Sequence, residues 1–186
     1  MRNERLKMMI VSALFAAIIA VFAQITIPLP FSPVPITGQT LAIGLAATIL
    51  GSRYGTLSVA IYLLLGAVGV PVFAGMSGGL GALIGPTGGF LIGFLPTAFI
   101  IGYYLEKTSF TVKQAIVANL IGVIITLAFG TVWLKFALQM TWMVAITAGA
   151  TPFIPLGIVK AVLAAAGGIA VRNRLKAARL LTVQTN

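Results

Sequence analysis

The stretch PFIPLGIVKAVLAAAGGIAV, residues 152–171, contains one charged side chain, that of Lys160. Twenty predominantly apolar residues are about the length of a helix that crosses a membrane. A lysine near the centre of such a helix costs about 2.5–3.5 kcal/mol on the membrane-insertion scale, and no carboxylate lies within the stretch to neutralise it. The stretch therefore predicts a transmembrane helix whose ammonium group serves a function.

The composition of the chain predicts that most of its surface faces lipid. Of its 186 residues, 60% are hydrophobic and 8% charged, whereas about 25% of residues are charged in soluble domains. We therefore expect an all-α membrane protein that forms a single domain over residues 1–186. No signal-peptide cleavage pattern follows the first apolar run, so that run is expected to be a retained span.

Several kinds of chemistry are excluded by what the sequence lacks. It has no Cys and no His, which excludes thiol catalysis and imidazole acid–base catalysis, and it has no GxxxxGK[ST] nucleotide-binding motif. An enzyme would have to pair Ser58 or Ser77 with Lys160, so we expect no catalytic residue, no metal site and no cofactor. The net charge of +10 is spread over several segments, which suits anionic lipid headgroups better than a nucleic acid.

Six apolar segments are expected to cross the membrane: residues 8–26, 37–51, 55–70, 89–105, 113–134 and 153–171. With six spans, most of the 12 basic residues fall on one side, namely Arg2, Arg5, Lys7, Arg53, Lys107, Lys113, Arg172, Arg174, Lys176 and Arg179. Because basic residues favour the cytoplasmic side, both termini are predicted to be cytoplasmic. Residues 136–150 could form a seventh span, but that would export the basic tail, so an interfacial or re-entrant helix is favoured.

Two long loops then lie outside the membrane. TIPLPFSPVPITG (26–38) is punctuated by proline, and PVFAGMSGGLGALIGPTGG (71–89) is rich in glycine yet apolar. Either loop could be a tight turn between helices. Because a solvated loop has no need of so many apolar side chains, we expect the loops to cap a pocket.

The surroundings of Lys160 follow from this topology. If its helix begins between Phe153 and Pro155, Lys160 lies about 8–10 Å below the outer helix end. The carboxylates of the chain, Glu4 and Glu106, are both expected on the cytoplasmic side. Lys160 could snorkel to the surface, but we expect its partner to be water, a backbone carbonyl or the carboxylate of a ligand.

The energy source and the partners are also constrained by the sequence. The predicted spans contain no carboxylate or histidine to relay protons, so the chain is expected to be a binding subunit driven by a partner rather than a self-sufficient facilitator. Small residues four apart allow helices to pack closely in lipid. Such residues on the first span, Ala13, Ala16, Ala17 and Ala20, are predicted to form the docking face.

Four motifs resemble one family of membrane proteins. They are PVPITGQTLA (33–42), LSVAIYLLLGAVGVPVFAG (57–75), GPTGGFLIGF (85–94) and PFIPLGIVKAVLA (152–164). In this order and over most of the chain, they resemble the biotin-specific S component (BioY) family of energy-coupling factor (ECF) transporters.

The resemblance implies a six-helix, multi-pass subunit of a prokaryotic cell membrane that captures biotin on the outer side. Its partners would be a transmembrane coupling subunit, which the alanine-rich first helix would face, and two cytoplasmic ATPases. Lys160 would bind the carboxylate of the substrate. The other predicted contacts, from their motif positions, are Gln39, Thr40, Phe73, Ser77, Thr87 and Phe90.

Four positions depart from the pattern of that family, which reads PFxPGDxxK in the last motif. Leu156 and Gly157 replace the Gly–Asp pair, and the aspartate of the family accepts hydrogen bonds from the ureido group of biotin. Phe90 replaces a tyrosine and Met76 a glycine. The acceptor could instead be a loop carbonyl or one of the side chains of Gln39, Thr40, Ser77, Thr87 and Asn119. Alternatively, the substrate could be an acid without a ureido group, such as lipoate.

Overall fold

The computed structural model of the chain describes residues 2–178, so that Arg179, assigned above to the cytoplasmic tail, lies outside them. The described chain folds into helices and one hairpin in this order: α1 (Arg2–Ala23), β1 (Thr26–Leu29), β2 (Ser32–Thr37), α2 (Gln39–Ala67), the 3₁₀ turn η1 (Ala74–Met76), α3 (Leu80–Ile84), α4 (Gly88–Lys107), α5 (Val112–Ala137), α6 (Trp142–Gly149), the 3₁₀ turn η2 (Thr151–Phe153) and α7 (Ile154–Ala177).

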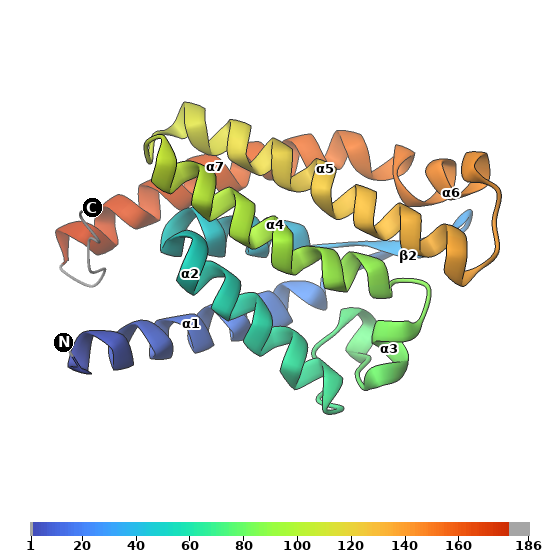
Figure 1. The fold of residues 1–186 in the computed structure, drawn as a ribbon, viewed down its shortest axis with the longest axis horizontal. Helices are drawn as coiled ribbons and strands as arrows, with labels where there is room; N and C mark the ends of the chain where they lie inside the picture. The colour runs from blue at the N-terminus through green and yellow to red at the C-terminus, as the bar shows by residue number, and fades with distance from the viewer. Residues whose placement is uncertain (1, 179–186) are drawn as a thin grey trace.

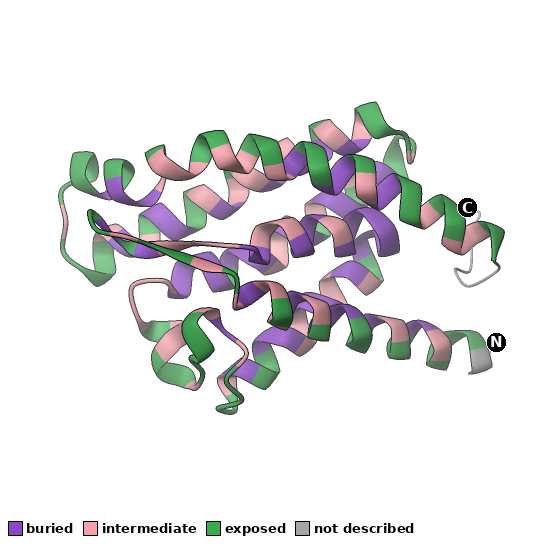
Figure 2. Ribbon diagram, turned by 180° about the vertical axis from the view of Figure 1, so that it is seen from behind, coloured by how far each residue is buried: buried purple, intermediate pink, exposed green. Residues whose placement is uncertain are grey.

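Four long helices form a closed ring. α2 packs against α4, α4 against α5, α5 against α7, and α7 returns to α2, while α1 packs on the outside of α2 (Figure 1). Glycines allow the close approach: a β-carbon at Gly93 of α4 would lie 2.8 Å from the β-carbon of Phe129, and one at Gly168 of α7 would lie 2.7 Å from Cγ2 of Thr48. Buried positions lie on the inner faces of the ring (Figure 2).

The helices are long and apolar enough to cross a membrane. By length and composition this applies to five stretches of the described residues: Glu4–Ala23, Gln39–Ala67, Gly88–Lys107, Val112–Ala137 and Trp142–Ala177, the last running through α6 and α7. α6 itself has eight residues, which is about 12 Å of helix and too short for the seventh span considered above. The predicted membrane class is confirmed.

The expectation of an all-α chain was wrong in one place. Residues 26–37, expected as a loop, form an antiparallel β-hairpin in which Thr26 pairs with Thr37, Ile27 with Ile36, and Leu29 with Ser32. Proline is unfavourable inside a helix but is tolerated on edge strands, and both strands of this hairpin are edges. The hydroxyl of Ser32 donates to the carbonyl of Ala148 at 2.8 Å, which ties the hairpin to α6.

The second and third predicted spans are the two halves of α2. We expected the whole of GSRYG, residues 51–55, to interrupt the helix, but the interruption is confined to Gly51, which has φ +82° and ψ −174°. The two halves fold against each other at this bend (Figure 1), and a β-carbon at Gly55 would lie 2.8 Å from Cα of Ala47.

Glu106 completes the bend. Its carboxylate accepts from the backbone N–H of Ser52 at 2.7 Å and from the Ser52 hydroxyl at 2.6 Å. A carboxylate at the first residue of a helix satisfies an otherwise free N–H and interacts favourably with the helix dipole. Glu106 therefore has a structural role at the end of the bundle where α1 begins and α7 ends (Figure 1).

We expect Gly51→Ala to lower the thermal unfolding temperature of the purified protein. The backbone of Gly51 is in a region that is essentially restricted to glycine, and an added β-carbon would lie 2.4 Å from Oε1 of Glu106. Gly167→Ala is the matched control, because its β-carbon would make an ordinary 3.5 Å contact with Leu45. Equal unfolding temperatures for the two variants would contradict this account of the bend.

Candidate functional site

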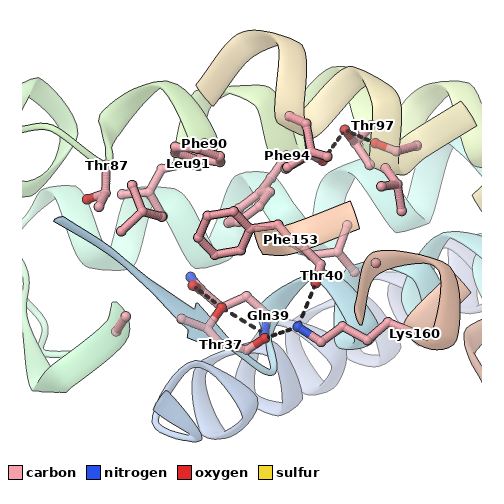
Figure 3. Close-up of a pocket in the computed structure, with 18 of the residues that line it drawn as sticks. Thr37, Gln39, Thr40, Thr87, Phe90, Leu91, Phe94, Thr97, Phe153 and Lys160 are labelled. Carbon is pink, nitrogen blue, oxygen red and sulfur yellow. Dashed lines mark hydrogen bonds between the residues drawn. The ribbon is translucent and has the colours of Figure 1, made fainter. Parts of the chain in front are cut away.

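A cavity of about 200 Å³ lies between the helices of the ring, and β2 and the segment between α2 and α4 also line it (Figure 3). The structure brings every predicted substrate contact to this one cavity: Lys160, Gln39, Thr40, Phe73, Ser77, Thr87 and Phe90 all line it. These residues come from α2, α4, α7 and the 71–89 segment. Elements far apart in the sequence therefore meet at one site.

The ammonium group of Lys160 is bonded to neutral oxygens. α7 begins at Ile154 with Pro155 in its first turn, as expected, and Lys160 Nζ donates to the backbone carbonyl of Thr37 at 2.5 Å and to Oγ1 of Thr40 at 3.4 Å (Figure 3). The contacts of Lys160 within residues 2–178 include no carboxylate. The cavity therefore carries a positive charge that the described part of the chain does not neutralise.

Three helix N-termini add to this positive charge. α2 begins at Gln39, α4 at Gly88 and α7 at Ile154, and residues of each first turn or its cap line the cavity. A helix N-terminus carries a partial positive charge and free N–H groups. Together with Lys160, these three termini favour an anion in the cavity.

Gln39 supports the lysine site through its neighbours. Its side chain is 4% exposed; its Nε2 donates to the Tyr62 hydroxyl at 2.6 Å, and its Oε1 accepts from the Thr37 hydroxyl at 2.9 Å. Both polar ends are thus in use, and Thr37 is held where its carbonyl meets Lys160. In this structure Gln39 positions the site rather than offering a free polar group.

The segment before α3 folds back onto the bundle through Phe73. The Phe73 side chain is 1% exposed, its ring packs edge-on to Tyr62 at 5.4 Å, and it fills the space over Gly66. The Ser77 hydroxyl donates to the carbonyl of Ala74 at 2.8 Å, so Ser77 stabilises the turn that it belongs to. Neither Ser77 nor Ser58, which bonds to Tyr54, forms the serine–lysine pair that an enzyme would need.

Gln24 holds the same segment and was not predicted. Lying just after α1, its Nε2 donates to the carbonyls of Val72 at 3.3 Å and Phe73 at 3.2 Å, and its Oε1 accepts from the N–H of Met76 at 3.0 Å. The only signal in the sequence was a glutamine at the end of an apolar run. Its partners are about 50 residues away, so their identity could not be read from that position.

Aromatic rings form an apolar wall of the cavity. Phe90 packs over Gly130 and against Phe153, with ring centroids 6.2 Å apart, and Phe94 also lines the cavity (Figure 3). The turn before α4 is fixed by Trp133, whose Nε1 donates to the carbonyl of Gly85 at 2.9 Å. Phe94 and Phe153 were missed because each lies in a continuous apolar run that does not reveal its inner face.

Gly157 also lines the cavity. A β-carbon at this position would lie 2.9 Å from Cγ1 of Val123, so α5 fills the space that a side chain at 157 would need. The cavity wall is therefore apolar at the position where the resembling family has an aspartate.

The predicted docking alanines of α1 do not share one face. Ala16 is 1% exposed and was wrongly placed on the docking face. It lies one turn from Ser12, which bonds to the carbonyls of Met8 and Tyr54, so this side of α1 packs on α2. Ala13 and Ala17 are exposed and Ala20 is half-buried, so only these three remain on or near the outer surface.

Known proteins share both the sequence pattern and the length of this chain. The family model for the BioY family matches residues 1–177. The chain is 42% identical to the biotin transporter BioY2 of Lactococcus lactis subsp. cremoris (strain MG1363) over 175 residues, which cover 94% of this chain and 95% of the relative. It is also 42% identical to the biotin transporter BioY of Thermotoga maritima over 160 residues, covering 86% and 92% of the two chains.

A solved structure has the same fold. It is the crystal structure of the S-component for biotin from an ECF-type ABC transporter, which is similar with a TM-score of 0.86 and 34% sequence identity, covering 93% of this chain and 94% of that one. The helix arrangement described above is thus the S-component fold.

We expect Gln24→Leu to loosen the segment that carries Phe73. The substitution removes an acceptor from the Met76 N–H and two donor contacts, so hydrogen exchange at residues 72–77 becomes faster. Gln114→Leu is the control, because Gln114 bonds to the Tyr104 hydroxyl of α4 and to Thr111 at the start of α5, both outside residues 72–77. Unchanged exchange in the Gln24 variant would contradict this role of Gln24.

Proposed function

This chain belongs to the BioY family, and we propose that it is the substrate-capture S component of an ECF transporter, which binds biotin for ATP-driven uptake. The observation that carries the proposal is the ammonium group of Lys160, held at the cavity without a carboxylate partner among its contacts. Biotin combines a carboxylate with an apolar arm and ring, and the cavity combines one cationic side chain with aromatic walls.

The proposed topology has six spans: α1, the two halves of α2, α4, α5 and α7. The described N-terminal end of α1, the bend of α2, the α4–α5 connection and the end of α7 lie at one end of the bundle (Figure 1), and the basic side chains of Arg53, Lys107 and Arg172 belong to that end. We assign this end to the cytoplasm because basic residues favour that side. The β-hairpin and the 71–89 segment then cap the cavity from outside.

Binding would replace one neutral partner of Lys160 by an anionic one. The substrate carboxylate would take the position near Thr40, whose hydroxyl is 3.4 Å from Nζ, while the carbonyl of Thr37 stays bonded. A charge-assisted hydrogen bond is about twice as strong as a neutral one, and the N-termini of α2 and α7 add favourable electrostatics. The rings of Phe90 and Phe153 would hold the apolar part of the substrate.

Energy would come from partner subunits. The chain has no nucleotide-binding motif, so a transmembrane coupling subunit and two cytoplasmic ATPases would drive uptake. We propose that the exposed side of α1 with Ala13 and Ala17 meets the coupling subunit, because small residues allow close helix packing within the lipid bilayer.

A second substrate, lipoate or a similar ring-and-chain acid, is favoured by one observation. Gly157 leaves an apolar wall beside Val123 where the resembling family has an aspartate. An acid without a ureido group would still use Lys160 and would not need the aspartate.

We expect Lys160→Met to weaken retention of labelled biotin by purified protein roughly 10- to 100-fold, since a hydrogen bond to a charged group is lost. Lys135→Met is the matched control, because Lys135 lies over the rings of Phe136 and Trp142 and does not line the cavity. Equal retention by the Lys160 variant and wild type would refute the carboxylate role. Measuring lipoate in the same assay distinguishes the two substrates.

Uptake into liposomes tests the dependence on partners. We expect the protein alone to give negligible accumulation of biotin, and co-reconstitution with a coupling subunit and ATPases to give ATP-dependent accumulation. Equilibration of biotin by the protein alone would instead support a self-sufficient facilitator.

A further inference from the structure

We propose that the side-chain oxygen of Asn119 is a second polar anchor for the substrate and accepts a hydrogen bond from an uncharged N–H group. This inference rests on the proposed function for the identity of the substrate. Asn119 lies on α5, lines the cavity and is 3% exposed. It lies one helical turn from Val123, the residue that faces Gly157.

The orientation of the Asn119 amide is fixed by its two donor contacts. Nδ2 donates to the carbonyl of Ala115 at 2.8 Å and to Oγ1 of Thr48 at 2.9 Å. A backbone carbonyl can only accept, so the amide nitrogen, and not the oxygen, must face Ala115. Both N–H groups are then used, and Oδ1 has no hydrogen-bond partner among the described residues.

This oxygen is open to the cavity. The polar side-chain atoms that are fully enclosed without a partner in the described chain are Thr56 Oγ1, Thr131 Oγ1 and Arg172 Nε. Oδ1 of Asn119 is not one of them, although it too has no partner, so it retains accessible surface. In a side chain that is 97% covered and lines the cavity, that surface faces the cavity.

The absence of a side chain at Gly44 makes room for this oxygen. A β-carbon added at Gly44 of α2 would lie 2.4 Å from Oδ1, which means that any side chain at this position would occupy the space beside the acceptor. The amide is therefore fixed by the two donor contacts of Nδ2 and by close packing of Oδ1 against Gly44.

Other polar side chains of the cavity are already engaged. Gln39 uses both ends of its amide, Ser77 donates to Ala74, and Thr97 and Thr126 share a hydrogen bond of 2.8 Å. Thr87 is half-exposed and can bond to water. The side-chain oxygen of Asn119, by contrast, is a buried acceptor that has no hydrogen-bond partner among the described residues.

The chemistry selects an N–H donor on a neutral group. A buried acceptor left without a donor costs about 1–3 kcal/mol, so a site of this kind rejects a ligand that lacks the donor. The ureido ring of biotin carries two N–H groups, whereas lipoate has none. Lys160 would bind the carboxylate of either acid, and Asn119 would distinguish between them.

The test compares Asn119→Ala with Thr48→Val. Both variants lose the hydrogen bond between α5 and α2, but only Asn119→Ala loses the acceptor. We expect Asn119→Ala to weaken biotin binding roughly 10- to 100-fold and Thr48→Val to weaken it less, because the contact with Ala115 still orients the amide. Competition by lipoate against labelled biotin should become relatively stronger in Asn119→Ala alone.

Equal biotin affinities for the two variants would overturn the inference. If Asn119→Ala does not fold, a structure of the wild-type protein with biotin decides: a ureido nitrogen within about 3.2 Å of Oδ1 supports the proposal, and only water or carbon beside Oδ1 overturns it. Wild-type protein that does not retain biotin would refute the proposed function and this inference with it, whereas wild-type binding with equal variants refutes the inference alone.

Discussion

The structure depends on one electrostatic constraint, an ammonium group kept in an apolar helix of a chain that has only two acidic residues. Burying a charge in such surroundings is expensive unless it is paired, and the hydrogen bonds of Lys160 within residues 2–178 go to oxygens of Thr37 and Thr40. Glu106 cannot help, because it is bonded to Ser52 at the bend of α2. The surroundings of the lysine, rather than its position alone, therefore define an anion site.

That site requires the hairpin, the segment between α2 and α4, and the helices to approach one another closely. The hairpin must end at Thr37 so that its carbonyl reaches Lys160, and Gln39 and Tyr62 hold that end in place. The segment between α2 and α4 must also fold inward. It can do so because Gly66 has no side chain in the space that the Phe73 ring occupies. Much of the glycine content thus serves packing around the cavity, in addition to helix contacts within lipid.

Hydropathy, charge counts and motif resemblance were sufficient to predict part of the site. They led to the start of α7, the lack of a carboxylate for Lys160 and the convergence of the cavity residues. They could not reveal the hairpin, the confinement of the α2 bend to Gly51, the contacts of Gln24, or the contacts that orient Asn119. Each of these depends on partners distant in the chain, as Gln24 does on Val72 and Asn119 on Thr48. Ala16 was placed on the outer face of α1 because the spacing of small residues does not show which row of them packs against α2.

The bond between Trp133 and Gly85 has a practical consequence. The chain has two tryptophans. The indole N–H of Trp133 is bonded to the turn that precedes α4, whereas the ring of Trp142, the first residue of α6, lies beside Lys135. Any displacement of that turn changes the polarity around one indole and not the other. The protein thus contains an intrinsic fluorophore whose emission spectrum reports the position of a cavity wall without an added label.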